Sequence, residues 1–371
     1  MTALTLIAAL AWLYLLFLHG RFWQAGPVLT PQRPRAAPQL AVVVPARDEA
    51  PTIDAVLRSL LAQDYPGPFR VILVDDGSTD GTGDIARRIG DERLTVLAGA
   101  ARPSGWSGKL WALAQGIDAA EQAGLLLLTD ADIVHDPAHL ATLVAKAEQG
   151  GLDLVSEMVA LKCDTLAERA LVPAFVFFFQ MLYPFEQVND PLRATAAAGG
   201  GTILVRRRAL QRIGGIAAVR AALIDDVALA RAVKRGGRIW LGHATQARSL
   251  RPYPGFADIW QMIARTAYVQ LRYSLLLLLA AVSAMAVVYL LPPLAVLFVP
   301  GAPRWLGLAA WAMMAVSYLP TLRRFGRSPL WSLALPAIAA FYLAATIGSA
   351  VNHYRGRGVA WKGRAYQGTN A

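Results

Sequence analysis

The two ends of this 371-residue chain contain no acidic residues. Asp and Glu occur only between Asp48 and Asp258, although the whole chain has 25 of them against 36 Lys and Arg. Both ends are also apolar, and the mean hydropathy of +0.41 is higher than soluble domains usually show. Basic, apolar flanks are typical of segments that contact an anionic membrane surface. The net charge of +11 therefore favours a membrane over nucleic acid as a partner.

Cysteine and the common phosphate-binding motifs are also scarce. The single cysteine, Cys163, cannot form an internal disulfide and is compatible with a reducing compartment. No G-x-G-x-x-G follows the first predicted strand, and no G-x-x-x-x-G-K-[ST] occurs. The chain shows no internal repeat and no low-complexity tract. A phosphate ligand would have to be bound by other groups, and a metal ion held by carboxylates is the obvious candidate.

Three apolar runs, at residues 40–44, 71–74 and 125–128, are predicted to be strands of a parallel sheet buried on both faces. Residues 52–62 have the i, i+3, i+4, i+7 spacing of an amphipathic helix. The predicted order of strand, helix, strand, helix, strand is an α/β fold with a Rossmann-like, mostly parallel sheet. Ligands bind such sheets at the carboxyl ends of the strands.

Two carboxylates, Asp130 and Asp132, follow the third predicted strand one residue apart. They would repel each other unless a cation lies between or beside them. Oxygen ligands of this kind suit Mg²⁺ or Mn²⁺, which usually also bind substrate phosphates. A solvated turn, where Asp is common, explains the same two residues equally well when they are taken alone.

Five motifs occur in the order seen in family 2 glycosyltransferases, and over residues 38–272 the chain resembles that family. They are VPARDE at 44–49, VDDGSTD at 74–80, Gly108-Lys109, Asp130-Ala131-Asp132 and Asp225-Asp226. The hydrophobic N-terminus, the C-terminal membrane block and the tail at 361–364 look most like the hopanoid-associated (hopene-associated) glycosyltransferase group. The resemblance implies a GT-A type nucleotide-diphospho-sugar transferase domain, a nucleotide-diphosphate sugar donor, a divalent cation and an inverting single displacement.

The resemblance assigns the ends of the first two strands to the nucleotide. Asp75 would accept hydrogen bonds from the base. Pro45, Arg47 and Glu49 would line the same nucleoside pocket, although a surface ion pair of small energetic value is an alternative for the two charged residues.

The resemblance also assigns residues to the diphosphate. Lys109, in the first turn of a predicted helix, can reach a phosphate or Asp130, and a solvated lysine is the alternative. Asp130 would contact the ribose or Lys109. Asp132 would bind the metal, which neutralises charge on the leaving nucleoside diphosphate. Arg265 could also meet the diphosphate, but its Q-x-x-x-R spacing differs from the Q-x-x-R-W of processive relatives, so polymer synthesis is not expected.

The acceptor side is assigned to a later part of the chain. Asp226 is the proposed general base, which would take the proton from an acceptor hydroxyl. Asp225 stands where the family has Glu, and both carboxylates are also explained by a helix N-terminus, whose dipole favours negative charge. Gly199, Gly200 and Gly201 permit close approach of the backbone to a sugar or acceptor, and a tight turn would use them equally well.

Two histidines need a separate interpretation. His135 and His139 are spaced i, i+4, as metal ligands on one helix would be. We predict instead that both lie at the surface of the helix that follows the third strand.

The chain divides into five predicted regions. They are a transmembrane anchor at 1–20, a Pro-rich linker at 21–38, a catalytic domain at 39–272, a membrane block of about three apolar segments at 273–352 and a basic tail at 353–371. Arginines after the anchor favour a multi-pass protein of the cell (inner) membrane with a cytoplasmic catalytic domain.

The topology of the C-terminal part is uncertain from the sequence. Three full spans would put Arg323 inside but Arg355 and Arg364 outside, against the positive-inside rule. We predict that one segment is re-entrant or interfacial, which returns the tail to the cytoplasm. Trp361, Lys362 and Arg364 would then lie near the membrane-facing mouth of the site.

The predicted acceptor is a lipid. Residues 175–183 are unusually aromatic and form either a buried core segment or an interfacial helix that admits a lipid. The sequence therefore predicts a membrane-bound inverting glycosyltransferase that acts on a lipid hydroxyl, and the resemblance of the flanks implies a place in hopanoid metabolism. The alternatives are transfer to polyprenyl phosphate, or a non-catalytic nucleotide-sugar-binding membrane protein of a lipid-synthesis complex. No pattern in the sequence predicts the oligomeric state.

Overall fold

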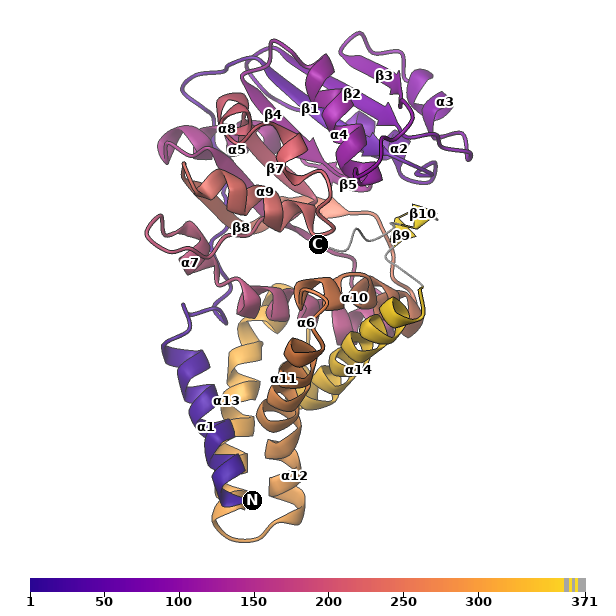
Figure 1. Cartoon of the computed structure of the whole chain (residues 1–371). Helices are drawn as coiled ribbons and strands as arrows, with labels where there is room; N and C mark the ends of the chain where they lie inside the picture. The colour runs from indigo at the N-terminus through magenta and orange to yellow at the C-terminus, as the bar shows by residue number, and fades with distance from the viewer. Residues whose placement is uncertain (357–359, 362–363, 366–371) are drawn as a thin grey trace.

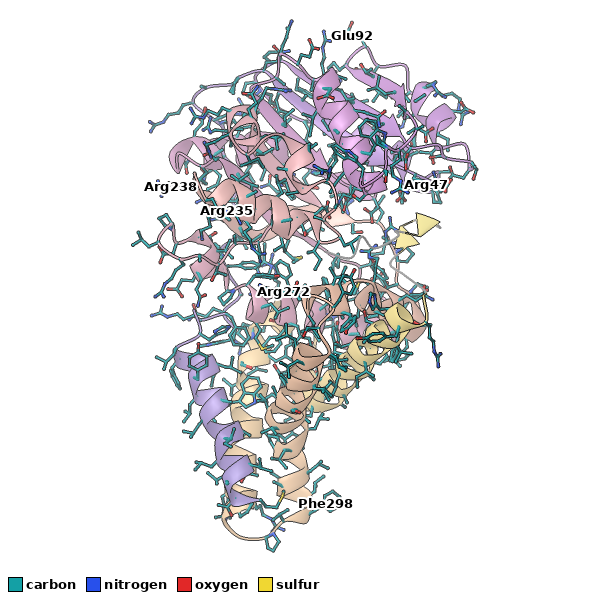
Figure 2. The ribbon with its side chains drawn as sticks, viewed as in Figure 1. Arg47, Glu92, Arg235, Arg238, Arg272 and Phe298 are labelled. Carbon is teal, nitrogen blue, oxygen red and sulfur yellow. The ribbon has the colours of Figure 1, made fainter. Side chains whose placement is uncertain are left out.

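The computed structural model describes residues 1–356, 360–361 and 364–365. An α/β domain is stacked on a block of helices (Figure 1). The N-terminus and the connection between α12 and α13 lie at the far end of this helical block (Figure 1). Phe298 marks that end, whereas Arg272 lies at the junction with the α/β domain (Figure 2).

One sheet of eight strands forms the centre of the α/β domain, in the order β3-β2-β1-β4-β7-β6-β8-β5. The strands are β1 (Leu40–Ala46), β2 (Phe69–Asp75), β3 (Leu94–Ala98), β4 (Leu125–Thr129), β5 (Ile133–His135), β6 (Leu154–Ala160), β7 (Thr202–Arg206) and β8 (Ile239–Ser249). β1 is parallel to β2 and β4, and β7 is antiparallel to β4. The carboxyl ends of β1, β2 and β4 therefore meet the amino end of β7 at one edge of the sheet.

Helices cover both faces of this sheet. They include α2 (Ile53–Leu61), α3 (Thr82–Arg87), α4 (Gly108–Ala119), α5 (His139–Gln149), α7 (Phe185–Asn189), α8 (Arg207–Arg212) and α9 (Asp225–Lys234). Val43 of β1 packs in one core with α4 and α9, while its neighbours Val42 and Val44 pack in the other with α2 and α5. Because alternate residues of a strand face opposite sides, a sheet covered on both faces needs the continuous apolar runs seen in the sequence.

The helical block holds the apolar flanks of the chain. It consists of α1 (Thr2–Phe17), α6 (Leu166–Leu182), α10 (Phe256–Gln270), α11 (Leu275–Met285), α12 (Leu291–Phe298), α13 (Ala302–Arg324) and α14 (Leu335–Tyr354). A π-helical turn at Ala286–Leu290 joins α11 to α12, and a 3-10 helix at Pro329–Ala334 precedes α14. The stretches Leu275–Phe298, Ala302–Arg324 and Pro329–Tyr354 are long and apolar enough to cross a membrane, while α1 is shorter, with 16 residues.

The aromatic run in α6 is part of the core of the helical block. Phe177 is fully buried and packs edge-on against Tyr318 of α13, with ring centroids 5.1 Å apart. Phe178 packs against Tyr342 of α14 at 4.8 Å. These contacts support the interpretation of residues 175–183 as a buried core segment.

The last apolar segment turns back towards the α/β domain. Arg324, at the end of α13, donates a hydrogen bond to the carbonyl of Ala244 in β8. The Trp311 indole, midway along α13, donates to Leu333 O at 3.3 Å, just before α14 begins. At the other end of α14, the hydroxyls of Tyr354 and Tyr268 of α10 are 2.9 Å apart. Residues 325–354 thus run part of the way along α13 and return to α10, as a re-entrant segment would.

The described part of the tail lies between the two halves of the molecule. Strands β9 (Ala360–Trp361) and β10 (Arg364–Ala365) pair with each other and are drawn between the α/β domain and the helical block (Figure 1). Lys362 lies outside the described residues, so its predicted place near the site stays a prediction.

Candidate active site

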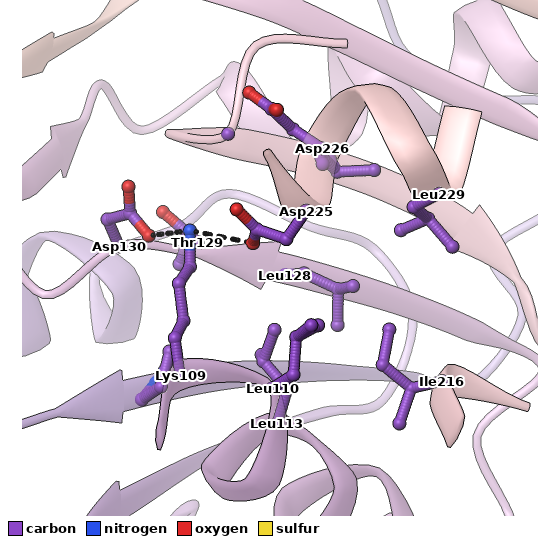
Figure 3. A pocket seen from close by; sticks show the side chains of 13 residues that line it. Lys109, Leu110, Leu113, Leu128, Thr129, Asp130, Ile216, Asp225, Asp226 and Leu229 are labelled. Carbon is purple, nitrogen blue, oxygen red and sulfur yellow. Dashed lines mark ion pairs between the residues drawn. The ribbon is translucent and has the colours of Figure 1, made fainter. Parts of the chain in front are cut away.

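Six of the predicted site residues line one pocket at the edge where β1, β2 and β4 end. They are Pro45, Lys109, Asp130, Gly200, Asp225 and Asp226. Apolar side chains of α4 and α9, among them Leu110 and Leu229, form its walls (Figure 3). Charged and apolar side chains therefore line this pocket together.

Lys109 connects the two acidic elements of the pocket. It lies in the first turn of α4, which begins after Ser107, whose hydroxyl accepts a hydrogen bond from the Leu110 N–H. Lys109 Nζ is 2.8 Å from Asp130 Oδ1 and 3.2 Å from Asp225 Oδ2 (Figure 3). Burial acts to lower the pKa of Lys109, but the two carboxylates outweigh it and raise that pKa. The ion pair with Asp130 is one of the contacts that the sequence analysis left open for Lys109.

Asp226 lies next to the ion pairs of Lys109 but takes no part in them. It follows Asp225 in the first turn of α9, and its Oδ1 accepts a hydrogen bond from the Val227 N–H at 2.7 Å. Burial and then the charge of Asp225 raise the pKa of Asp226 to about 7, while Lys109 opposes the rise. The pocket holds three carboxylates and one ammonium group, which pairs with Asp130 and Asp225, and no dashed line joins Asp226 to Lys109 (Figure 3).

The glycine loop, residues 199–201, brings the backbone against Asp226. A Cβ added to Gly200 would lie 3.1 Å from Asp226 Oδ2, which only a small shift could relieve. A Cβ at Gly199 would lie 2.7 Å from the carbonyl oxygen of Glu157 in β6. The Ser156 hydroxyl also bonds to both the N–H and the carbonyl of Gly199. The loop is therefore packed between the sheet and Asp226, where side chains do not fit.

Asp132, the predicted metal ligand, is held by a residue that the sequence interpretation missed. Arg251 Nε donates to Asp132 Oδ2 at 2.8 Å, and Ser249 Oγ donates to the same oxygen at 3.1 Å. Arg251 Nη2 also donates to Glu49 Oε1 at 2.7 Å. One guanidinium thus joins the ends of β1 and β4. Its signal in the sequence is an arginine two residues after a long strand and directly before Pro252.

Other residues predicted to bind the nucleotide sugar lie at the same edge of the sheet but do not line the pocket of Figure 3. Asp75 Oδ1 accepts a hydrogen bond from the Ser78 N–H at 2.9 Å, within its own loop. Arg47 donates to the carbonyl of Gly77 at 3.2 Å, and it is drawn on the side of the domain nearest β9 and β10 (Figure 2).

Arg265 is placed by its effect on a neighbour. Burial raises the pKa of Tyr253, and the charges of Arg251 and then Arg265 oppose that rise. Arg265 lies on α10 in the helical block, and its charge acts on Tyr253, two residues after Arg251.

The described residues do not form a complete metal site by themselves. No group of three or more His, Cys, Asp or Glu side chains in this part of the chain is arranged to hold a metal ion. The carboxylate of Asp132 has the oxygen chemistry that Mg²⁺ and Mn²⁺ prefer. These residues fit a cation that takes most of its ligands from a bound diphosphate and only one side chain from the protein.

The prediction for the two histidines was wrong. His135 lies in β5 and His139 begins α5, so they do not share a helix. Both are buried, with exposed fractions of 4% and 0%, and their rings stack with centroids 5.0 Å apart. They lie behind the site rather than at the surface.

Comparison with known proteins agrees with this geometry. The model of glycosyl transferase family 2 matches residues 41–214. A dodecaprenyl-phosphate galacturonate synthase from Rhizobium johnstonii is 31% identical over 132 residues, which are 35% of this chain and 38% of that protein. A 4,4'-diaponeurosporenoate glycosyltransferase from Staphylococcus aureus is 35% identical over 94 residues, 25% of this chain and 24% of that protein. The chain thus covers less than two fifths of the length of either relative.

A solved structure has the same fold. The mannosyltransferase PcManGT from Pyrobaculum calidifontis, in complex with GDP-Man and Mn²⁺, has a TM-score of 0.54 and 21% sequence identity, covering 94% of this chain and 98% of that chain. The α/β domain is therefore a GT-A domain, as predicted. Residues 41–214 match the model of glycosyl transferase family 2, and a curated relative of the same part of the chain is named as a glycosyltransferase.

Proposed function

We propose that the chain transfers a sugar from a nucleotide-diphosphate sugar to the hydroxyl of a lipid, with inversion at the anomeric carbon. The main support is Asp226, a carboxylate on the pocket wall with a pKa raised to about 7. A general base works best when its pKa lies near the working pH, because it is then both ionised and basic. A solvated surface aspartate would not have this property.

The reaction is a single displacement. Asp226 takes the proton from the acceptor hydroxyl as that oxygen bonds to the anomeric carbon, and the bond to the nucleoside diphosphate breaks. Lys109, held between Asp130 and Asp225, contributes positive charge near the leaving group. Asp75, Arg47, Glu49 and Pro45 would bind the nucleoside at the ends of the neighbouring strands.

A divalent cation, Mg²⁺ or Mn²⁺, belongs to this proposal. Asp132 would bind it together with the donor diphosphate, and the bound cation would neutralise charge that develops on the leaving group. The support is the carboxylate chemistry of Asp132 and the Mn²⁺ and GDP-Man named for the mannosyltransferase of similar fold. Arg251 already pairs with Asp132, so the cation must compete with the guanidinium for that carboxylate.

The lipid acceptor is supported by the position of the site. The chain passes directly from Arg251 at the site to α10, which packs along α14 in the helical block. The names of two relatives include a lipid, dodecaprenyl phosphate in one and diaponeurosporenoate in the other. A hopanoid acceptor rests only on the resemblance of the flanks and the tail to the hopanoid-associated group.

The proposed topology places the α/β domain in the cytoplasm, where nucleotide sugars are found. α1, α11–α12 and α13 would cross the inner membrane, and α14 would return the tail to the cytoplasmic side. Exposed Ser104 lies in the α/β domain, and exposed Ala302 lies at the far end of the helical block. In a Cys163→Ser background, a membrane-impermeant thiol reagent should label Ala302→Cys but not Ser104→Cys in intact cells. Labelling of Ser104→Cys alone would reverse the orientation.

Transfer itself is tested with the purified full chain in lipid nanodiscs. A panel of radiolabelled nucleotide sugars is offered with hydroxyl lipids, including a hopanoid, and separately with a polyprenyl phosphate. We expect label in the extracted hydroxyl lipid, and loss of that label in excess chelator. Transfer only to polyprenyl phosphate would establish the alternative acceptor, and absence of transfer from every donor would contradict the proposed activity.

A further inference from the structure

Behind the glycine loop, a chain of hydrogen bonds runs through four buried side chains that the proposed reaction does not use. Glu157 Oε2 is 2.7 Å from His139 Nε2, and His139 Nδ1 is 2.7 Å from His135 Nδ1. His135 Nε2 is in turn 3.0 Å from Thr129 Oγ1. None of the four side chains is more than 4% exposed. We call these residues the buried relay; they come from β6, α5, β5 and β4.

The positions of the protons follow from the end of the relay at Thr129. Its hydroxyl donates its single proton to Gly201 O at 2.8 Å, so it accepts from His135 Nε2. Burial, and then His139, lower the pKa of His135 well below its ordinary value, so this ring is neutral and its Nδ1 accepts. His139 Nδ1 therefore donates, and one proton is shared between His139 Nε2 and Glu157. Every ring nitrogen has a partner, and the His139–Glu157 pair has no net charge.

The relay ends on the backbone of the active site. The carbonyl of Gly201 that accepts from Thr129 also accepts the Asp130 N–H at 3.4 Å. The preceding residue, Gly200, is the one that lies against Asp226. The relay thus holds the loop that separates a donor-side carboxylate from the proposed base.

Packing alone does not require this network. Apolar residues of similar volume often stabilise a core as well as buried charged pairs do, whereas a fully hydrogen-bonded network fixes one arrangement of its parts. A neighbour extends the relay, because Ser59 Oγ accepts a hydrogen bond from the His135 N–H. A network of this kind is suited to holding the backbone of the site in one position.

We infer that Glu157, His139 and His135 are positioning residues for sugar transfer, which set the spacing between Asp130 and Asp226 through the Gly201 carbonyl. The inference rests on the proposed function for its consequence in catalysis. Its structural part, the fixing of the Gly201 carbonyl, does not depend on the activity.

Two substitutions of one residue separate hydrogen bonding from charge. Glu157→Leu and Glu157→Gln both remove the negative charge and keep a similar volume. The glutamine amide can donate to Nε2 of a neutral His139, whose Nδ1 still donates to His135. Leucine offers no partner, so the relay is broken at its first member only in this variant.

Amide hydrogen exchange of the full chain in nanodiscs tests the structural part without turnover. We expect the Asp130 amide and the glycine loop to exchange about tenfold faster in Glu157→Leu than in the wild type, because local opening becomes easier. Glu157→Gln should stay within about threefold of the wild type. Equal exchange in all three proteins, or equal loss of protection in both variants, would overturn the inference.

Kinetics test the consequence for transfer. In Glu157→Leu, kcat should fall about tenfold with little change in the KM of the donor, because a misplaced reacting group costs rate rather than binding. Glu157→Gln should restore most of kcat. If Glu157→Leu does not fold, Thr129→Val cuts the relay at its other end, and unchanged Asp130 exchange in that variant would also refute the inference. Changed exchange in a chain that transfers no sugar would contradict the proposed function alone, whereas unchanged exchange in an active chain would contradict the relay alone.

Discussion

The glycine loop separates two polar clusters in which charge is arranged differently. On the pocket side, the ammonium of Lys109 pairs with Asp130 and Asp225, and Asp226 is left without an ion pair to it. On the inner side, the buried relay pairs one carboxylate with one histidine and satisfies every ring nitrogen. Negative charge is therefore in excess only on the side that opens to a ligand. Burial, and then this excess, raise the pKa of Asp226 as a base needs, whereas a balanced network gives rigidity.

The largest expected effect comes from removing the extra carboxylate. Asp226→Asn keeps the size of the side chain but removes the base, and general-base catalysis typically contributes about 10²–10⁴-fold to a rate. Turnover with a hydroxyl lipid should fall by that amount, while donor binding measured by calorimetry persists. Asp118→Asn, on the exposed side of α4, is the matched control and should stay near wild type. Turnover near the wild-type value in Asp226→Asn would favour an acceptor that is already an anion, such as polyprenyl phosphate.

A second change frees the carboxylate that Arg251 now neutralises. Arg251→Gln removes the guanidinium from Asp132 and Glu49, so a cation no longer competes with it. One charge-assisted hydrogen bond is worth about 1.5–3 kcal/mol, so we expect Mn²⁺ to bind roughly tenfold to a hundredfold more tightly in the absence of donor. Electron paramagnetic resonance of free Mn²⁺ measures this affinity. Arg248→Gln, an exposed arginine paired with Asp136, serves as the control. Weaker Mn²⁺ binding in Arg251→Gln would show that Asp132 is not where the cation binds.

The residues that sequence patterns located are those whose signals are local. The apolar run of β4 ends at Asp130, and the acidic pair Asp225-Asp226 opens α9, so each carboxylate could be placed on its own element. The edge at which they meet then follows from the parallel order of the strands.

The residues that were missed or misplaced depend on contacts between distant parts of the chain. Arg251 meets Asp132 across 119 positions of sequence, and no periodicity predicts that contact. His135 and His139 have helical spacing, but strand β5 ends at His135 and helix α5 begins at His139. The carboxylate that pairs with His139 belongs to Glu157, on another strand. Non-local pairing of this kind is decided by sheet order, which the sequence pattern alone does not contain.

A third change makes the charge imbalance of the pocket worse. Lys109→Met leaves its carboxylates without their shared cation, so the pKa of Asp226 should rise further above 7. One pKa unit corresponds to ~1.4 kcal/mol of lost attraction. A base must be ionised, so turnover at pH 7 should fall about fivefold for the first unit and about tenfold for each further unit, with a smaller loss at pH 9. The pH profile of kcat measures the shift, and Lys109→Arg, which keeps the charge, should leave the midpoint near its original place. A downward shift in Lys109→Met would contradict the assignment of Asp226 as the base.

The smallest expected effect is on thermal stability. Its measurement tests the excess of negative charge in the pocket without any substrate. The pKa of Asp226 is about 7 in the folded chain, above the usual value of about 3.9 for an unfolded one. Between these values the folded state binds more protons, so ionisation of Asp226 lowers the free energy of unfolding as pH rises from about 4 to 7. Above pH 7 the whole free-energy cost of ionising Asp226 is present.

Asp226→Asn should therefore raise the thermal midpoint by a few degrees at pH 8, and the gain should shrink as the pH approaches 4. Differential scanning fluorimetry of both proteins across this range measures the difference, with Asp118→Asn showing no such trend. A midpoint that falls at pH 8 would mean that the ionised carboxylate is stabilised by its surroundings, and that the pocket does not hold the excess of charge on which its role as a base depends.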